Sequence, residues 1–211
     1  MKKMFFFTFV LVMLFVLSAC GKGNDQAAND TNKNEGAVTQ ETDTTTMEER
    51  ADEIGGEKAS TTDSLTIDLN NSDGKKIGTA KLEQADTGVL IKVEASDLPP
   101  GAHGFHIHET GKCDGPAFES AGGHFNPTGA SHGMDHEKGS HAGDLPNLEV
   151  GEDGTVKTEV TAEHVTLVSG EENSLLDEDG SALVIHAKPD DGKSQPAGDA
   201  GDRIACGVIA R

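Results

Sequence analysis

The chain has 211 residues, with 17 lysines and arginines against 37 aspartates and glutamates, and its formal net charge is −20. Because nucleic acid is itself a polyanion, we do not expect a chain of this charge to bind it. Hydrophobic residues make up only 34% of the sequence, and five of the eight phenylalanines lie between positions 5 and 15. The remaining hydrophobic residues suffice for the core of one domain of roughly 150 residues. This excludes a large multidomain enzyme and a polytopic membrane protein.

The N-terminus is typical of a bacterial lipoprotein signal. Two lysines precede an apolar stretch over residues 4–17, which is shorter than a membrane span of ~20 residues but fits a signal peptide. Residues 17–20 read Leu-Ser-Ala-Cys and resemble the lipobox, in which cleavage exposes a cysteine that carries lipid. We therefore expect a signal peptide over 1–19, lipid on Cys20, and a location on the extracytoplasmic face of a bacterial envelope membrane. An ordinary signal peptide that happens to end near a cysteine is the alternative.

The next segment is a tether. Residues 21 to about 60 are rich in Asn, Asp, Thr, Glu, Gln and Gly and contain almost no aliphatic side chains. Such a segment buries too little apolar surface to offset its ordering entropy. We therefore expect a lipidated, flexible, acidic segment over 20–60 and a folded domain over 61–211.

Alternation of apolar and polar residues with a period of two begins near Ser64 and predicts β-strands. Such strands are expected around residues 65–69, 77–82 and 89–95, and residues 182–187 and 204–209 are apolar enough to form central strands. A hairpin is expected to pair residues 148–150 with residues 156–160 across the turn 151–154. Between His108 and Asp144 no period holds, and such a long irregular loop is usually functional or disordered. The pattern predicts an all-β Greek-key barrel or sandwich with long loops.

All nine histidines lie between positions 103 and 186. His106 and His108 are two residues apart on a predicted strand, so they share one face and can converge on one metal. The other candidate ligands follow at greater separation: His124, His132, His141, Asp144 and His186.

Three imidazoles with one carboxylate suit Zn²⁺, and four imidazoles suit Cu²⁺. Two such sites need eight donor positions, whereas the candidates number seven. Seven residues can fill eight donor positions if one imidazole binds both metals, but the spacing of the residues does not establish such a bridge. A single zinc site with spare histidines stays open at this point.

Cysteine usage fits an oxidising compartment. If Cys20 carries lipid, Cys113 and Cys206 remain as a candidate disulfide pair. Two buried free thiols are the alternative.

Four motifs together resemble the bacterial secreted type of copper–zinc superoxide dismutase, and the resemblance covers roughly residues 65–211. The motifs are Gly104-Phe105-His106-Ile107-His108-Glu109, Ala121-Gly122-Gly123-His124-Phe125-Asn126-Pro127, Gly143-Asp144-Leu145-Pro146-Asn147 and Gly201-Asp202-Arg203-Ile204-Ala205-Cys206-Gly207-Val208-Ile209. The resemblance implies a Greek-key sandwich that holds one copper and one zinc per subunit.

Residue by residue, the resemblance implies the following site. The copper ligands would be His106, His108, His124 and His186, and the zinc ligands His124, His132, His141 and Asp144, with His124 as the bridge. Arg203 matches the family's active-site arginine, Asp190 the carboxylate that links a copper-ligand and a zinc-ligand imidazole, and Cys113 and Cys206 the family's disulfide. His103 would form structural hydrogen bonds, His136 is expected to be exposed to solvent, and His164 has no partner motif.

The activity implied is conversion of superoxide to O₂ and H₂O₂ by alternate reduction and reoxidation of copper, with zinc in a structural role. Arg203 would hold the anion, and His124 would release a proton to the product. The acidic chain repels such a substrate at long range, so a local basic patch from Arg203 and nearby lysines is expected to offset this.

The alternatives are a non-catalytic zinc- or copper-binding lipoprotein of the same fold, and a purely structural adhesin that would leave the metal-suited residues unexplained. Bacterial relatives occur as monomers and as dimers, so a homodimer stays open.

Overall fold

The computed structural model describes residues 63–134, 136–137 and 139–211. The expected signal peptide, Cys20 and the tether over 20–60 lie outside these residues. Almost all regular structure in the described part is β-strand: β1 Ser64–Asn71, β2 Lys76–Gln84, β3 Val89–Ala95, β4 Gly101–His103, β5 Phe105–His108, β6 Leu148–Val150, β7 Val156–Ala162, β8 Ser181–His186 and β9 Arg203–Ile209, with one short 3₁₀ helix, η1, at Glu119–Ala121. None of the helical structure in the described segments is long and apolar enough to cross a bilayer.

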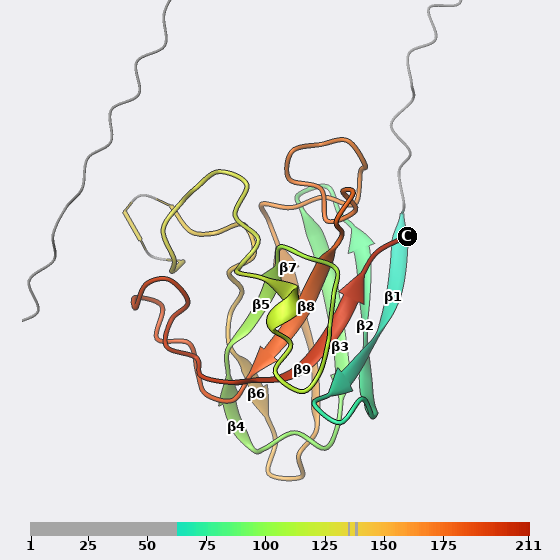
Figure 1. The fold of residues 1–211 in the computed structure, drawn as a ribbon, viewed down its shortest axis with the longest axis vertical. Helices are drawn as coiled ribbons and strands as arrows, with labels where there is room; N and C mark the ends of the chain where they lie inside the picture. The colour runs from blue at the N-terminus through green and yellow to red at the C-terminus, as the bar shows by residue number, and fades with distance from the viewer. Residues whose placement is uncertain (1–62, 135, 138) are drawn as a thin grey trace, which may run out of the picture. The chain divides into compact units, whose positions relative to one another are not determined.

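Seven strands form one antiparallel sheet in the order β5-β8-β9-β1-β2-β3-β7, and β4 pairs with β6 in a second, two-stranded sheet. The larger sheet curls, as Figure 1 shows. This confirms the all-β architecture predicted from the period-two pattern. β5, β8 and β9 are neighbours at one end of the sheet, and they carry four of the expected site residues.

The main core fills the inside of the curled sheet. In β3, for example, Val89, Ile91, Val93 and Ala95 are buried, while Lys92 and Glu94 between them face away from the core. β8 differs because all six of its residues are buried. One face of β8 contributes Leu183 and Ile185 to the main core, and the other contributes Ala182 and Val184 to a smaller cluster.

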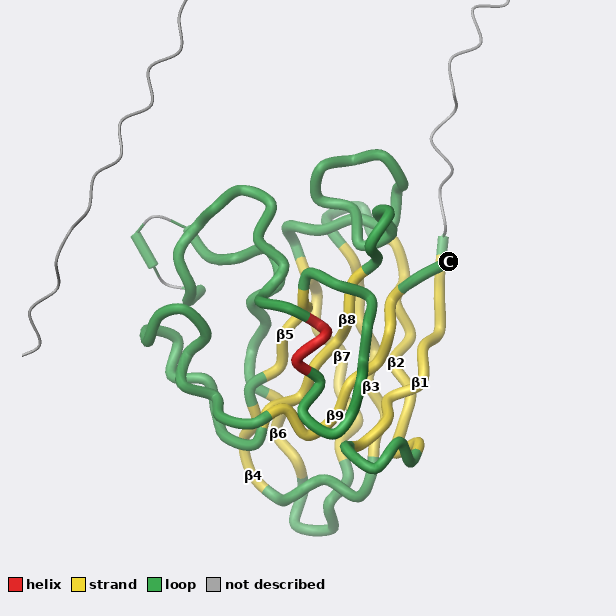
Figure 2. The backbone as a smooth tube through the Cα atoms, in the orientation of Figure 1, coloured by secondary structure: helices red, strands yellow, loops and turns green. Residues whose placement is uncertain are grey.

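That smaller cluster lies beneath the loop that follows β5. It also contains Phe118, Ala121 and Cys206, with Cys113 at its edge. Figure 2 shows this loop and η1 lying across β8 and β9. The expected disulfide is confirmed, because Cys113 and Cys206 are bonded. The bond ties the loop to β9.

The expected hairpin between β6 and β7 is wrong in its pairing. Both strands and their turn exist, and the N–H of Gly151 donates to the carbonyl of Thr155. However, β6 pairs with β4 over three residues, and β7 pairs with β3 over seven. Alternation in a sequence gives the buried face of a strand but not its partner. The long alternating edge of β3 offers β7 more backbone hydrogen bonds than a three-residue strand could.

The expected irregular loop is confirmed between β5 and β6, where η1 is the only regular element in the described residues. A second long loop joins β8 to β9 over residues 187–202. We call these the metal loop (109–147) and the active-site loop (187–202). The acidic stretch at 171–179 is only partly exposed to solvent, because Leu175 and Leu176 in its middle are buried in the main core.

Candidate metal centre

β5 presents its two histidines on the face opposite to the main core. Phe105 and Ile107 point into that core, so the alternation places His106 and His108 together on the other side, where both are buried. β8 pairs with β5 and brings His186 to the same place. Gly104, just before β5, has no room for a side chain: a Cβ there would lie 2.7 Å from the Cβ of Ala200 and 3.2 Å from Cε1 of His106. This glycine therefore permits the close approach.

His124 reaches the two β5 histidines from the metal loop. The segment around it runs antiparallel to β5: the N–H of Glu109 donates to the carbonyl of Gly123, and the N–H of Phe125 donates to the carbonyl of Ile107. An isolated bridge pairs His108 with His124. Backbone pairing thus fixes the loop where its side chain meets the strand.

The first group of candidate ligands is His106, His108, His124 and His186. Their ligand atoms all lie within 4.8 Å of one another, and all four residues are buried. The ring centroids of His106 and His124 are 4.0 Å apart. Nε2 of His108 lies 3.4 Å from Nε2 of His186. The structure therefore brings together the four residues that the family resemblance implies for copper.

Hydrogen bonds leave one ring nitrogen of each of these histidines for a metal. Nδ1 of His108 donates to the carbonyl of Gly122 at 3.0 Å, and Nδ1 of His186 donates to the carbonyl of Gly201 at 3.1 Å. Nδ1 of His106 and Nε2 of His124 are buried and have no hydrogen-bond partner. Buried polar atoms without partners are costly, so their presence here fits a bound metal.

The second group is His124, His132, His141 and Asp144, whose ligand atoms also lie within 4.8 Å of one another. Oδ1 of Asp144 lies 2.8 Å from Nδ1 of His124, 3.1 Å from Nδ1 of His132 and 3.3 Å from Nδ1 of His141. Its other oxygen, Oδ2, accepts the backbone N–H of Gly133 at 2.9 Å. Three imidazoles around one carboxylate form a donor set that suits Zn²⁺.

His124 belongs to both groups. Its Nδ1 faces Asp144, and its Nε2 is the unpartnered nitrogen described above. The structure therefore places one imidazole where it can contribute a nitrogen to each group.

The protonation states of these residues at neutral pH favour metal binding. Burial lowers the pKa of His108 to about 2, and the neighbouring His124 contributes. Burial, together with His106, lowers the pKa of His186 to about 3. Burial alone would raise the pKa of Asp144, but hydrogen bonds from His124 and Gly133 outweigh it and hold the pKa at about 2. Neutral imidazoles and an ionised carboxylate are the forms that bind a metal.

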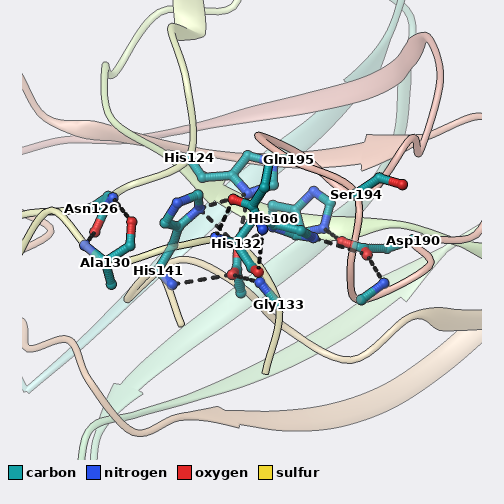
Figure 3. A network of polar contacts seen from close by, with 12 residues as sticks. His106, His124, Asn126, Ala130, His132, Gly133, His141, Asp190, Ser194 and Gln195 are labelled. Carbon is teal, nitrogen blue, oxygen red and sulfur yellow. Dashed lines mark hydrogen bonds and ion pairs between the residues drawn. The ribbon is translucent and has the colours of Figure 1, made fainter. Parts of the chain in front are cut away.

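Asp190 of the active-site loop joins the two groups. Its Oδ2 lies 2.6 Å from Nε2 of His106, and its Oδ1 lies 3.1 Å from Nε2 of His132 (Figure 3). Burial would raise the pKa of Asp190, but the hydrogen bond with His106 and the backbone N–H of Gly192 hold the pKa well below its usual range. The position inferred for this carboxylate is the one the structure gives it.

Arg203 begins β9 as the Cα partner of His186. Its two terminal nitrogens donate to the carbonyls of Phe118 and Gly122, each at 2.6 Å. The carbonyl of Gly122 therefore receives hydrogen bonds from both Arg203 and His108. Arg203 also lines a surface pocket of about 590 Å³ together with Glu119 and Gly201. A fixed cation in an accessible pocket can hold a small anion. His186 lines a separate pocket of about 360 Å³, which shares Gly201 with the first.

The remaining expected residues are placed as follows. His103 is buried, with Nδ1 2.8 Å from the carbonyl of His186 and Nε2 2.8 Å from that of Pro99, which confirms a structural role. His136 is half-buried rather than exposed, and His164 is exposed.

Among the lysines that could form a basic patch, Lys188 is at the pocket. The stem of its side chain lies 3.4–3.6 Å from the Cβ position of Gly201, which lines that pocket. Lys112 and Lys193 are exposed, and Lys138 lies outside the described residues.

Sequence patterns did not indicate roles for Asn147 and Gln195, although both hydrogen-bond to the site. Asn147 lies in one of the family motifs quoted above, but the motif does not indicate what this side chain does. Gln195 contacts the backbone of a residue 63 positions away, and such a contact leaves no trace in a single sequence.

Known proteins with similar sequences and structures agree with this geometry. Residues 76–209 match the family model described as copper/zinc superoxide dismutase (SODC). The chain is 57% identical to superoxide dismutase [Cu-Zn] 1 of Aquifex aeolicus over 143 residues, which are 67% of this chain and 85% of that protein.

Solved structures of similar chains include a double mutant of a SOD-like protein from Bacillus subtilis, with a TM-score of 0.68 and 46% identity, covering 69% of this chain and 97% of that one. Another is Cu/Zn superoxide dismutase from Brucella abortus, with a TM-score of 0.58 and 34% identity, covering 69% of this chain and 99% of that one. The chain therefore belongs to the copper/zinc superoxide dismutase family.

Proposed function

We propose that this chain is a lipid-anchored, extracytoplasmic superoxide dismutase that converts two superoxide anions and two protons to O₂ and H₂O₂. Copper would be held by His106, His108, His124 and His186, and zinc by His124, His132, His141 and Asp144. The observation that carries the proposal is the pair of buried four-ligand groups that share His124. The similarity to superoxide dismutases of Aquifex and Brucella supports the substrate.

Copper, when bound, supplies the one-electron redox couple that dismutation requires, and zinc, which has no redox chemistry, supplies only fixed charge and structure. The protein's part begins with the substrate anion. The guanidinium of Arg203 is held by two carbonyls, so it needs no reorganisation to attract superoxide into the pocket that it lines.

Nε2 of His124 is the atom at which the protein would hold a proton for the product. It is buried, unpartnered and faces the first group, while Nδ1 of the same ring contacts Asp144. A proton held there lies beside the anion site and can pass to the peroxide product. The second proton comes from solvent through the pocket.

Orientation of the ligands depends on acceptors outside the two groups. Carbonyls of Gly122 and Gly201 fix the tautomers of His108 and His186, and Asp190 does the same for His106. Such partners hold the ring plane and increase ligand basicity.

Local charge supports an anionic substrate in spite of the net charge of −20. Lys188 and Arg203 flank Gly201 at the pocket, although Glu119 and Asp202 also line it. Charges more than ~8–10 Å away are largely screened at physiological salt, so these near cations have a disproportionate effect.

The test combines metal quantification with activity. We expect about one copper and one zinc per chain, with rapid dismutation. His186→Ala should abolish dismutation and copper binding but leave zinc bound, since His186 belongs to the first group only. His164→Ala is the matched control, because His164 is exposed and lies in neither group. A copper-loaded wild-type protein without turnover would instead support a metal-binding lipoprotein.

The proposed anchor and location rest on the motif that ends at Cys20 and are tested separately. We expect the wild-type chain, expressed in a bacterium, to partition into detergent and to be labelled by a fatty acid. Cys20→Ser should lose both properties without loss of dismutase activity. Detergent partitioning of the Cys20→Ser chain equal to wild type would contradict the anchor.

A further inference from the structure

The active-site loop packs against the metal loop along a short line of contacts, which we call the loop seam. On one side are residues 132–133 and 147, and on the other are residues 190–195. The seam carries His132, a proposed zinc ligand, and Asp190, which contacts His132 at 3.1 Å and the proposed copper ligand His106 at 2.6 Å. The seam is therefore where the order of one loop can affect the ligands on the other.

Gln195 makes a pair of hydrogen bonds across the seam to the backbone of His132. Its Oε1 accepts the N–H of His132 at 2.9 Å, and its Nε2 donates to the carbonyl of the same residue at 2.9 Å. Figure 3 shows the amide beside His132. Both backbone groups of one candidate zinc ligand are thus bonded by a single side chain, while the imidazole of that ligand contacts Asp144 and Asp190.

Asn147 makes the same arrangement in the opposite direction. Its Oδ1 accepts the N–H of Asp190 at 2.8 Å, and its Nδ2 donates to the carbonyl of Asp190 at 3.0 Å. Each loop therefore uses one carboxamide to bind the backbone of one residue on the other loop. Gln195 binds that of His132, a proposed zinc ligand. Asn147 binds that of Asp190, which contacts one ligand of each proposed metal site.

The backbones themselves touch at the seam. Gly133 has φ +106°, and a Cβ there would lie 2.2 Å from the carbonyl oxygen of Gly192. No side chain fits between the loops at this point, so a small movement of either loop is transmitted to the other. The N–H of Gly133 also donates to Asp144, which ties the seam to the second group.

We propose that Gln195 is a positioning residue that fixes His132 for zinc and, through Asp190, couples zinc binding to the orientation of His106. This inference rests on the proposed metal assignment. Gln195 belongs to neither group of candidate ligands; it acts by holding the backbone from which the His132 imidazole extends. It is exposed to solvent, so its loss leaves no cavity and no buried unpaired side chain.

Two substitutions separate the two hydrogen bonds. Gln195→Ala removes both. Gln195→Glu keeps the size of the side chain and an acceptor for the N–H of His132, but an ionised carboxylate cannot donate to the carbonyl. Ser194→Ala is the matched control: the Ser194 hydroxyl donates only to Asp191 within the same loop and does not cross the seam.

The readout is the binding of Zn²⁺ alone to copper-free protein, measured by competition with a chromophoric chelator, together with the d–d spectrum of Co²⁺ in its place. We expect about tenfold weaker Zn²⁺ binding for Gln195→Ala, at the low end of the effect of outer partners of metal ligands, and an altered Co²⁺ spectrum. Gln195→Glu should be weakened too. Ser194→Ala should match wild type, and the melting temperature of the metal-free protein should be similar in all four.

Equal Zn²⁺ affinities in Gln195→Ala and Ser194→Ala would overturn the proposal. The proposal would also be overturned if both variants lost Zn²⁺ affinity and both showed the same fall in the melting temperature of the metal-free protein. Asn147→Ala provides a further check. Asn147 and Gln195 hold the same seam, so the losses of Zn²⁺ affinity in their two alanine variants should not add up in the double variant. Failure of the metal assignment would look different, since wild type itself would then bind no zinc, or His132→Ala would bind it as tightly as wild type.

Discussion

Replacing Asp190 tests whether one carboxylate supports both metal sites. Its two oxygens contact two buried histidines, Nε2 of His106 at 2.6 Å and Nε2 of His132 at 3.1 Å. Each contact fixes the nitrogen on one side of a ring and leaves the other free to bind metal. Asp190→Ala removes both contacts, so the expected loss falls on copper and zinc together.

The magnitude follows from what such partners contribute. Removing the hydrogen-bond acceptor of a ligand histidine typically weakens metal binding by about 10- to 100-fold, or about 1.4–2.8 kcal/mol per metal. Asp190→Asn is more selective. An amide has one acceptor oxygen, so it can accept from only one of the two imidazoles, and the amide N–H₂ opposes the other. We therefore expect the asparagine variant to weaken one metal strongly and the alanine variant to weaken both.

Asp191→Asn is the matched control. It removes the same charge from the neighbouring position, but Asp191 is exposed and its carboxylate accepts hydrogen bonds from Lys193 and Ser194 of its own loop. Substitutions of this kind at the surface change the free energy by no more than ~0.5 kcal/mol, which corresponds to about twofold in affinity.

The assays are chelator competition for each metal in protein loaded with that metal alone, followed by dismutase activity of the fully loaded protein. If Asp190→Ala binds copper and zinc as tightly as Asp191→Asn does, the link through this carboxylate plays no part in metal binding. Loss of one metal only in Asp190→Ala would show that the second contact is incidental.

Two further predictions concern stability. Reduction of the disulfide between Cys113 and Cys206, which are 93 residues apart, should lower stability by ~4–5 kcal/mol on chain-entropy grounds and the melting temperature by about 10 °C or more; an unchanged calorimetric transition in reductant would contradict this. In the metal-free protein, burial lowers the pKa of His108 to about 2 and that of His186 to about 3, so between those values and 6.5 the unfolded chain binds more protons than the folded one. The free energy of unfolding should therefore fall as pH falls from 6.5 toward 3, by up to ~1.4 kcal/mol per pH unit for each histidine, and Asp144 adds a loss in the same direction from 3.8 down to about 2. Urea titrations across this window check the slope, and a flat profile would refute it.

Residue types and local spacing were enough to predict the strands and the ligand pair on β5. Alternation is a property of neighbouring residues, so β1, β2 and β3 could be read directly, and the same period put His106 and His108 on one face. β8 and β9 could be read from apolar runs that suit central strands. The family motifs then supplied the ligand set, because they preserve the order of residues that meet in space.

Strand partners and loop contacts could not be predicted in this way. The pairing of β6 with β4 depends on which edges are free after the longer strands have paired, and that is a property of the whole sheet. The carbonyls of Gly122 and Gly201 accept from His108 and His186 through backbone atoms that every residue possesses, so no residue type signals them.

The residue types already contain the chemistry of the site: six histidines and an aspartate of suitable kind, two cysteines, and one arginine in a motif. It took the folded chain to show that His124 faces both groups, that Asp190 lies between His106 and His132, and that Gln195 holds His132 by its backbone. These contacts join loops tens of residues apart, so their geometry depends on how the two loops pack on the sheet and not on any local preference of the chain.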